Sequence, residues 1–294
     1  MTNRLAVAAS AKYPELRPDW PLLQAALARR GISATTMVWT DPDADWDELD
    51  LVVANGAWDN IHRPAEFLDW AEQVAALTQV VNSPTTLRWN MDKRYLATLD
   101  AAGVPIVPTT FIEPTDDPDH AELPDTEFVV KPNISGGGFQ TARYSPTRGD
   151  HAAARTHLTQ LLAAGRTAMV QPYQHAIDSE QAETGLIFLA GEYSHAIRKG
   201  PLLPAGTRPG DSLHSEDGIG PTRATAVQIE MAAHALGAAE ALLGPTTYAR
   251  VDLVPDEDGA PLLIELELLD PALFFDHHLP GADRFADVLA QTFG

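Results

Sequence analysis

The sequence FVVKPNISGGGFQTARY, residues 128–144, decides how the rest of the chain is interpreted. Its first residues are apolar and partly β-branched, which predicts a buried strand that ends at Lys131. Three consecutive glycines, residues 136–138, follow a short polar stretch. Because glycine has no side chain, such a turn lets a phosphate-bearing molecule lie against the backbone. The alternative is a flexible hairpin loop without a ligand.

Composition limits the classes to which the protein can belong. The chain has 294 residues, of which 45% are hydrophobic, so it can bury a sizeable core in two or three subdomains. A net charge of −21 argues against nucleic-acid and anionic-membrane partners, because both require a basic surface. The absence of cysteine excludes disulfides, thiolate metal ligands and a cysteine nucleophile, and it fits a reducing cytoplasm. The sequence contains neither a membrane span nor a signal peptide that we recognise, and the first apolar run is expected to form a strand.

The pattern of apolar residues divides the chain into three parts. Residues 1–86 alternate between apolar strands and amphipathic helices, which predicts a parallel sheet with helices on its faces. Residues 87–170 hold short strands broken by turn residues, which is typical of a small α+β subdomain. Residues 171–294 hold longer strands, an Ala-rich helix and a Gly/Pro/Ser-rich stretch at 201–221. A stretch of that length without regular structure is often a lid over a site.

Three local predictions concern helices and surface. Asp19 is expected to cap a helix that stops at Gly31. Residues 83–103 are expected to form a single helix, and the acidic run at 41–50 is expected to be solvated surface.

A second informative region is the pair of strands in YARVDLVPDEDGAPLLIELELLDP, residues 248–271. The sequence PDEDG predicts a turn, so the flanking strands form a hairpin. Side chains alternate along a strand, so Arg250 and Asp252 share one face, as do Glu265 and Glu267. The other face would be filled by apolar residues, namely Ile264, Leu266 and Leu268.

In the simplest register of this hairpin, three carboxylates and one guanidinium converge. Three negative charges on one surface destabilise one another unless a cation neutralises them, and hard oxygen ligands suit Mg²⁺. An exposed acidic sheet face is the alternative. Together with the lysine and the glycine turn, the acidic cluster has the parts that hold a nucleoside triphosphate. The chain contains neither a G-x-x-x-x-G-K-[ST] P-loop nor a G-x-G-x-x-G dinucleotide motif.

The order of these motifs resembles the ATP-grasp fold of carboxylate–amine ligases, the group of D-alanine–D-alanine ligase and glutathione synthetase. The motifs in chain order are WNMDKRYL, FVVKPNISGGG, VQPY, SHAIRKG, YARVDL and IELEL. The resemblance covers nearly the whole chain from about Leu87. It implies an α/β (α+β) class: a Rossmann-like parallel-sheet domain over 1–86, a central lid subdomain over 87–170, and an antiparallel-sheet domain over 171–294.

For the nucleotide, the resemblance implies contacts at matching positions. Lys93 and Lys131 would touch the phosphates of ATP. The other implied contacts are the flexible lid turn at Gly136, Gly137 and Gly138, the adenine hinge at the backbone of Gln171 and Tyr173, and the ribose contact at Asp178.

For the metal and the transferred phosphoryl group, the resemblance also implies specific residues. Those for Mg²⁺ are Asp252, Glu265 and Glu267. Arg250 would face the transferred phosphoryl group, and Arg198 or Lys199 would add positive charge. These two are neighbours on one strand, so only one of them is expected to point into the site. The family often has Asn where this chain has Glu267, which is compatible with two Mg²⁺ ions and can alter metal affinity.

Within the family, the chain is similar to a bacterial subgroup that includes the O-ureido-serine cyclo-ligase of the cycloserine pathway. The stretches that carry this similarity are NSPTTLRWNMDKRYL, GVPIVPT, SHAIRKGPLL and IELELLDPALFF. The similarity implies a small-molecule carboxylate that ATP activates as an acyl phosphate and that a nitrogen in the same molecule then captures. Arg63 or Arg198 would pair with the substrate carboxylate, and a plain surface charge is the alternative for Arg63.

Other readings stay open at this point. The nucleophile can be a second molecule, as in an amino-acid or peptide ligase, or the enzyme can stop at phosphoryl transfer. A nucleotide-binding protein without catalysis is disfavoured, because binding alone does not require a complete Mg²⁺ cluster. The Ala- and Leu-rich helix at 224–243 is compatible with a core position or with a homodimer interface.

Overall fold

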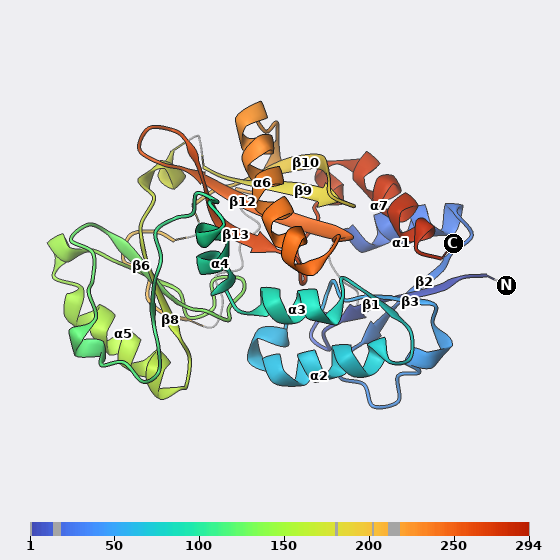
Figure 1. The fold of residues 1–294 in the computed structure, drawn as a ribbon, viewed down its shortest axis with the longest axis horizontal. Helices are drawn as coiled ribbons and strands as arrows, with labels where there is room; N and C mark the ends of the chain where they lie inside the picture. Colours follow the sequence, from blue (N-terminus) through green and yellow to red (C-terminus); the bar gives the residue numbers. More distant parts are fainter. Residues whose placement is uncertain (1, 14–18, 180–181, 202, 211–217, 294) are drawn as a thin grey trace.

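The computed structural model describes residues 2–13, 19–179, 182–201, 203–210 and 218–293. These residues form three β-sheets that follow one another along the chain and are covered by helices (Figure 1). The described residues also include six short 3₁₀ helices: η1 (Trp46–Glu48), η2 (Asn60–His62), η3 (Pro118–His120), η4 (Pro146–Arg148), η5 (His175–Asp178) and η6 (Phe275–His277). Among the described residues, no helix combines the length and the apolar character that crossing a lipid bilayer requires.

The first sheet is parallel, as the sequence predicts, with the strand order β2-β1-β3-β4. Its strands are β1 (Arg4–Ala9), β2 (Ser33–Val38), β3 (Leu51–Val53) and β4 (Gln79–Val81), and its helices are α1 (Asp19–Arg29), α2 (Pro64–Ala75) and α3 (Pro84–Met91). Every residue of β1 after Arg4 is buried. A parallel strand covered on both faces requires such a continuous apolar run.

The second sheet is antiparallel, with the order β5-β8-β6-β7. It comprises β5 (Thr110–Ile112), β6 (Phe128–Pro132), β7 (Ala142–Tyr144) and β8 (Ala168–Pro172), and α5 (His151–Ala163) packs on it. Phe128, Tyr144 and Leu158 are buried between α5 and the sheet. Lys131 lies near the end of β6, five residues before Gly136, where the sequence places it.

The third sheet is also antiparallel, with the order β11-β10-β9-β12-β13. Its strands are β9 (Glu183–Leu189), β10 (Glu192–Lys199), β11 (Gly220–Thr222), β12 (Tyr248–Pro255) and β13 (Pro261–Glu267). One face packs against α4 (Tyr95–Ala101) and α6 (Ala226–Leu243). The other face is apolar where it meets α7 (Leu279–Gln291) and the first sheet, and polar toward the end that carries Arg250 and Asp252. Figure 1 shows α7 beside α1, so the end of the chain returns to its beginning.

Two buried asparagines fix the first sheet to the third. The Asn82 side chain donates to the carbonyls of Tyr248 and Leu268, and the Asn90 side chain donates to the carbonyl of Leu266. The Asn90 side-chain oxygen also accepts from the Leu268 N–H at 2.7 Å. Because buried backbone groups must find partners, these two amides hold the β12–β13 hairpin in place relative to α3.

The expected single helix over 83–103 is wrong. Helices α3 and α4 are separate, and Asp92 between them is extended, with φ −105° and ψ 114°. The Lys93 N–H donates to the Asn133 carbonyl at 3.0 Å, which is a partner outside the helix. A tertiary hydrogen bond therefore interrupts the helical pattern, and the interruption brings Lys93 next to the loop that follows β6.

The two remaining local predictions concern Asp19 and the acidic run at 41–50. Asp19 is the first residue of α1, and its carboxylate accepts hydrogen bonds from the N–H groups of Phe274 and Phe275. It therefore stabilises a turn near the far end of the chain in addition to starting its helix. The acidic residues of 41–50 are all exposed, as predicted, and Trp46 and Leu49 anchor the segment to the core.

The buried His157 on α5 leads to a prediction about stability. Burial lowers its pKa to about 4, and the Gln140 backbone opposes this shift only in part. The unfolded chain takes up a proton near pH 6.5 and the folded protein only near pH 4, so stability is complete above pH 6.5 and falls as the pH approaches 4. Urea unfolding of His157→Leu should show a loss between pH 7 and 4 that is smaller than in wild type, by up to about 3 kcal/mol.

The exposed His234 on α6 provides the control, because His234→Leu should keep the wild-type pH dependence. Identical pH profiles for the His157 variant and wild type would contradict this account of the buried histidine.

Candidate active site

A cavity of about 800 Å³ lies where the three sheets meet. Its wall takes residues from every part of the chain, from the segment before α1 to the loop after β13. Most of the residues predicted from the sequence line it: Lys93, Lys131, Gly136, Gly137, Gly138, Gln171, Tyr173, Lys199, Arg250, Glu265 and Glu267. Lys131 and the acidic hairpin, far apart in sequence, thus share one cavity.

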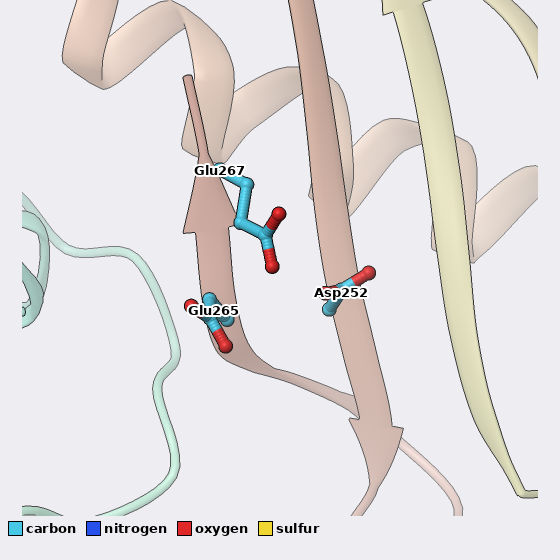
Figure 2. A group of neighbouring side chains, drawn as sticks. All are labelled: Asp252, Glu265 and Glu267. Atoms are coloured by element: carbon cyan, nitrogen blue, oxygen red, sulfur yellow. The ribbon is translucent and has the colours of Figure 1, made fainter. Parts of the chain in front are cut away.

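The acidic cluster has the predicted register. Asp252 pairs with Glu265 across the hairpin, and Arg250 pairs with Glu267. Figure 2 shows the three carboxylates converging from β12 and β13, and one oxygen of each lies within 4.8 Å of the others. Asp252 is almost fully buried behind the two glutamates. Oxygen ligands at this spacing suit a hard divalent cation.

The prediction that Ile264 fills the apolar face is wrong. The register shifts between Asp252 and Leu253, which pair with Glu265 and Leu263 respectively and leave Ile264 as an extra residue. Such a β-bulge re-aims a side chain, and Ile264 lines the cavity instead of the core. Leu266 and Leu268 are buried as predicted.

Cations from two strands balance the buried carboxylates. The Lys199 ammonium lies 2.6 Å from Asp252 and 2.5 Å from Glu183. The Arg250 guanidinium donates to Asp252 at 2.9 Å and also pairs with Glu267. Burial opposes ionisation of Asp252, but Arg250 and Lys199 hold its pKa below the ordinary value. Burial raises the pKa of Glu267 to about 7, although Arg250 opposes the shift.

The two lysines that we predicted at the phosphates both lie near Glu265. Lys93 is 3.1 Å from the Glu265 carboxylate and also donates to the Ser135 carbonyl, which directly precedes the glycine turn. Burial lowers the pKa of Lys131, and the Glu265 charge opposes this effect. Two ammonium groups thus stand in one cavity beside one carboxylate. This arrangement attracts a polyanion such as a triphosphate.

The glycine turn has backbone angles that favour glycine. Gly137 and Gly138 have φ values of 55° and 73°, in the left-handed region. The next residue but one, Gln140, donates its N–H to the Gly210 carbonyl at 2.7 Å, so the turn is joined to the segment 203–210. Residues 202 and 211–217 of the expected lid over 201–221 lie outside the described part of the chain. Leu203, within it, lines the cavity.

The predicted hinge and ribose residues have other partners. The Tyr173 N–H donates to the Glu127 carbonyl at 2.8 Å, so this amide belongs to the central sheet rather than to an adenine. The Tyr173 hydroxyl donates to Asp178 at 2.6 Å, and Asp178 also pairs with Arg143 at 3.3 Å. Asp178 is not among the residues of the cavity wall. Its predicted ribose contact would require it to exchange these partners.

The choice between Arg198 and Lys199 is settled by the strand. Lys199 is buried and lines the cavity, whereas Arg198 is exposed on the opposite face of β10. The predicted contact of Arg198 with the phosphates or the substrate would therefore lie outside this cavity. Arg63 is also outside the cavity wall: its guanidinium pairs with Glu66 and lies 5.1 Å from the Trp39 ring centroid. Its predicted pairing with the substrate carboxylate would require it to leave these partners.

Several residues of the cavity wall escaped the sequence analysis. Glu183 and Asp270 carry charge, and Trp58, Asn60 and Ile61 come from the loop before α2. Arg63 lies in the same loop sequence, WDNIHRP, and its neighbours rather than Arg63 itself line the cavity. Asp270 was within reach of sequence reasoning, because it lies only three residues after Glu267 in the same motif.

Comparison with known proteins agrees with this geometry. Residues 5–82 match the family model described as D-cycloserine synthetase DcsG, N-terminal domain. The cycloserine biosynthesis protein DcsG of Streptomyces lavendulae is 38% identical over 284 residues, which cover 93% of each chain. The crystal structure of D-cycloserine synthetase DcsG superimposes with a TM-score of 0.89 at 36% identity, over 99% of this chain and 100% of the other.

More distant solved structures share the fold. D-Alanine–D-alanine ligase from Bacillus anthracis complexed with ATP has a TM-score of 0.65 at 15% identity, over 100% of this chain and 97% of that one. The ATP-grasp ligase PsnB, complexed with a phosphomimetic variant of its minimal precursor, Mg and ADP, has a TM-score of 0.63 at 18% identity, over 99% of both chains.

The fold and this site define an ATP-dependent ligase of the ATP-grasp class, as the order of motifs indicates. Within that class, the chain belongs to the family of the cycloserine biosynthesis protein DcsG.

Adjacent cations on β10 allow a direct test of the charge balance. Lys199→Met leaves Asp252 and Glu183 buried without their shared ammonium, so we expect a loss of about 3–5 kcal/mol in the free energy of unfolding. Arg198→Met removes the same formal charge from an exposed position and should cost less than about 0.5 kcal/mol. Urea denaturation measures both. Equal losses in the two variants would show that the Lys199 ion pairs do not stabilise the fold.

Proposed function

We propose that this protein is a cyclo-ligase that uses ATP to activate the carboxylate of a ureido amino acid and closes a ring within that molecule, as in cycloserine formation. The observation that carries the proposal is the 38% identity to the cycloserine biosynthesis protein DcsG over 93% of both chains. Support comes from the cavity, in which lysines and carboxylates suited to a triphosphate share one wall.

In this proposal, the nucleotide spans the cavity between the central and third sheets. Lys93 and Lys131 would contact its phosphates, and the turn at 136–138 would lie over them. The adenine would lie near Gln171 and the bulge residue Ile264, which offers an apolar surface to the base. The Tyr173 amide takes no part, because the central sheet uses it.

The three carboxylates fit a magnesium site, since their oxygens lie within 4.8 Å of one another. We propose that Asp252, Glu265 and Glu267 hold Mg²⁺. When bound, the ion would neutralise charge on the phosphates of ATP. The chain's own contribution is to orient these carboxylates: Arg250 and Lys199 fix Asp252 from behind, and Lys93 fixes Glu265.

The proposed reaction has two steps. A carboxylate oxygen of the substrate forms a bond to the γ-phosphorus of ATP, and ADP leaves with the electron pair of the broken phosphorus–oxygen bond. A nitrogen of the same substrate then forms a bond to the acyl carbon and loses a proton, and phosphate leaves with the electron pair of the carbon–oxygen bond. Arg250 would stabilise the transferred phosphoryl group, because a guanidinium offers paired donors to phosphate oxygens.

Water must stay away from the acyl phosphate, because hydrolysis would waste it. The glycine turn and residues 203–210 are joined by the hydrogen bond from Gln140 to Gly210, and Leu203 reaches the cavity. We propose that these two segments cover the bound substrates together. The reaction consumes ATP, so we place the enzyme in the cytoplasm.

The proposed substrate class is tested by a screen. Wild-type protein with ATP and Mg²⁺ is offered serine, O-ureidoserine and other ureido amino acids, and ADP release and product mass are measured. We expect ADP formation with a ureido amino acid, together with a cyclic product that is lighter than the substrate by at least the elements of water that leave with phosphate and the released proton. A product that joins two substrate molecules would indicate an intermolecular ligase, and phosphorylated substrate as the end product would indicate a phosphotransferase.

The nucleotide site is tested at Lys131. Lys131→Ala removes a charged donor from the proposed phosphate contact, so calorimetry should show ATP binding about 10–100-fold weaker than in wild type. Arg88→Ala is the control, because Arg88 forms an exposed ion pair with Glu72 away from the cavity wall. Unchanged ATP affinity in the Lys131 variant would remove this residue from the nucleotide site.

A further inference from the structure

The turn between β13 and α7 carries a residue with a strained backbone at the cavity. Phe274 has φ 53° and ψ 45°, in the left-handed region that a bulky residue seldom adopts. Among the described residues, four that are not glycine have a positive φ, and Phe274 is the one of them that lines the cavity. Such a conformation costs free energy, so it persists where surrounding contacts impose it, often beside a functional site.

Asp19 holds this turn from the other end of the chain. Its carboxylate accepts hydrogen bonds from the N–H of Phe274, at 2.8 Å, and from the N–H of Phe275. Successive amides converge on one anion in a turn of this kind. A further hydrogen bond, from His195 Nε2 to the Leu273 carbonyl at 2.8 Å, joins the turn to β10. Because Asp19 begins α1, the conformation of Phe274 depends on the first part of the chain.

The same turn contacts the Arg250 guanidinium in two ways. Arg250 donates to the Ala272 carbonyl at 3.2 Å, and its Cζ atom lies 5.8 Å from the centroid of the Phe274 ring. A cation is attracted to an aromatic ring, and more strongly where water is excluded. From the hairpin, Asp252 and Glu267 pair with the same guanidinium. Contacts from the hairpin and from the turn therefore determine the orientation of Arg250 together.

We infer that Asp19 and Phe274 are positioning residues for Arg250: the Asp19 carboxylate holds the Phe274 ring beside the guanidinium and thereby aims it at the transferred phosphoryl group. With a negative φ, the side chain of residue 274 would leave its backbone in another direction, so the strain serves to keep the ring in place. The inference rests on the proposed function, in which Arg250 faces the phosphoryl group. It links the start of α1 to the phosphoryl-transfer step.

The first test measures ADP formation with O-ureidoserine. Phe274→Leu keeps an apolar side chain but removes the aromatic face, so kcat should fall about 3–30-fold, the range expected for a cation beside a shielded ring. Asp19→Asn replaces one acceptor oxygen with an NH₂ group, which leaves one of the two amides without its partner, and should lower kcat to a similar extent. The KM for ATP should stay within about twofold of wild type in both variants. Wild-type kcat in either variant would overturn the inference.

Asp283→Asn is the control. Asp283 pairs with Arg29 and Arg30 where α7 meets α1, so this variant removes an acid from the same junction. It should keep the wild-type kcat.

Phe274→Gly separates an effect through the ring from an effect on folding alone. Glycine adopts a positive φ without strain, so this variant lacks the ring and does not need Asp19 to hold the turn. Its kcat should match that of Phe274→Leu, and adding Asp19→Asn should change it by less than about twofold. If Asp19→Asn lowers kcat by the same factor in this variant as in wild type, Asp19 does not act through Phe274 and the inference is overturned.

The orientation of Arg250 can also be followed without substrate. Its Nε–H donates to Asp252 at 2.9 Å, and we expect a resolved signal for it in a ¹H–¹⁵N spectrum of the full chain, assigned through the carbons of its side chain. The ring current of Phe274 shifts this signal. Phe274→Leu and Asp19→Asn should therefore move it in the same direction, and Asp283→Asn should leave it in place. An unmoved signal in Asp19→Asn would contradict the inference.

Failure of this inference is distinguishable from failure of the proposed function. If wild type forms no ADP with any ureido amino acid, the proposed function is overturned, and the spectrum still decides whether Asp19 orients Arg250. If wild type forms ADP and the Asp19 and Phe274 variants match it in kcat and in the Arg250 signal, the inference is overturned and the proposed function stands.

Discussion

The structure depends on bringing three carboxylates together at the centre of the molecule. Asp252, Glu265 and Glu267 repel one another, and Asp252 is almost fully buried, so the fold requires cations beside them. Those cations come from three places: Arg250 on the same hairpin, Lys199 on β10, and Lys93 between α3 and α4. The break between α3 and α4, where the Lys93 N–H bonds to the Asn133 carbonyl, places that lysine at the cavity. The charge balance of the site therefore depends both on the local structure around Lys93 and on the way the three sheets meet.

The two sides of the cavity wall are held in place by different kinds of interaction. The hairpin is fixed by ion pairs and by the buried amides of Asn82 and Asn90, which hold its backbone against the first sheet. Opposite it, the turn at 136–138 consists of glycines, and hydrogen bonds from Gln140 and Arg143 join the chain after the turn to the segment 203–210. Both sides of the cavity are therefore held by hydrogen bonds to neighbouring elements.

Strand periodicity allowed much of the site to be predicted. A period of two placed Arg250, Asp252, Glu265 and Glu267 on one face, and the hairpin has that register. The same rule predicted that only one of Arg198 and Lys199 points inward but not which one, because that depends on packing against α6. The bulge at Ile264 and the helix break at Lys93 escaped prediction for a related reason. Both features arise from contacts with residues distant in sequence, so the local pattern of apolar residues does not predict them.

The end of the cavity next to the first sheet was the least predictable region, because loops build it. Arg63 was predicted to pair with the substrate carboxylate, yet it contacts Glu66 and Trp39 outside the cavity wall. Asn60 lines the wall instead. A hydrogen bond joins Asp270 to Asn60, a residue 210 positions away, and no periodicity links the two. The acidic hairpin rests on strands whose alternation can be counted, whereas the end of the cavity next to the first sheet rests on hydrogen bonds between two loops. The fold class and the acidic hairpin were therefore accessible from sequence, whereas the contacts between the loops of the cavity wall became accessible only through the structure.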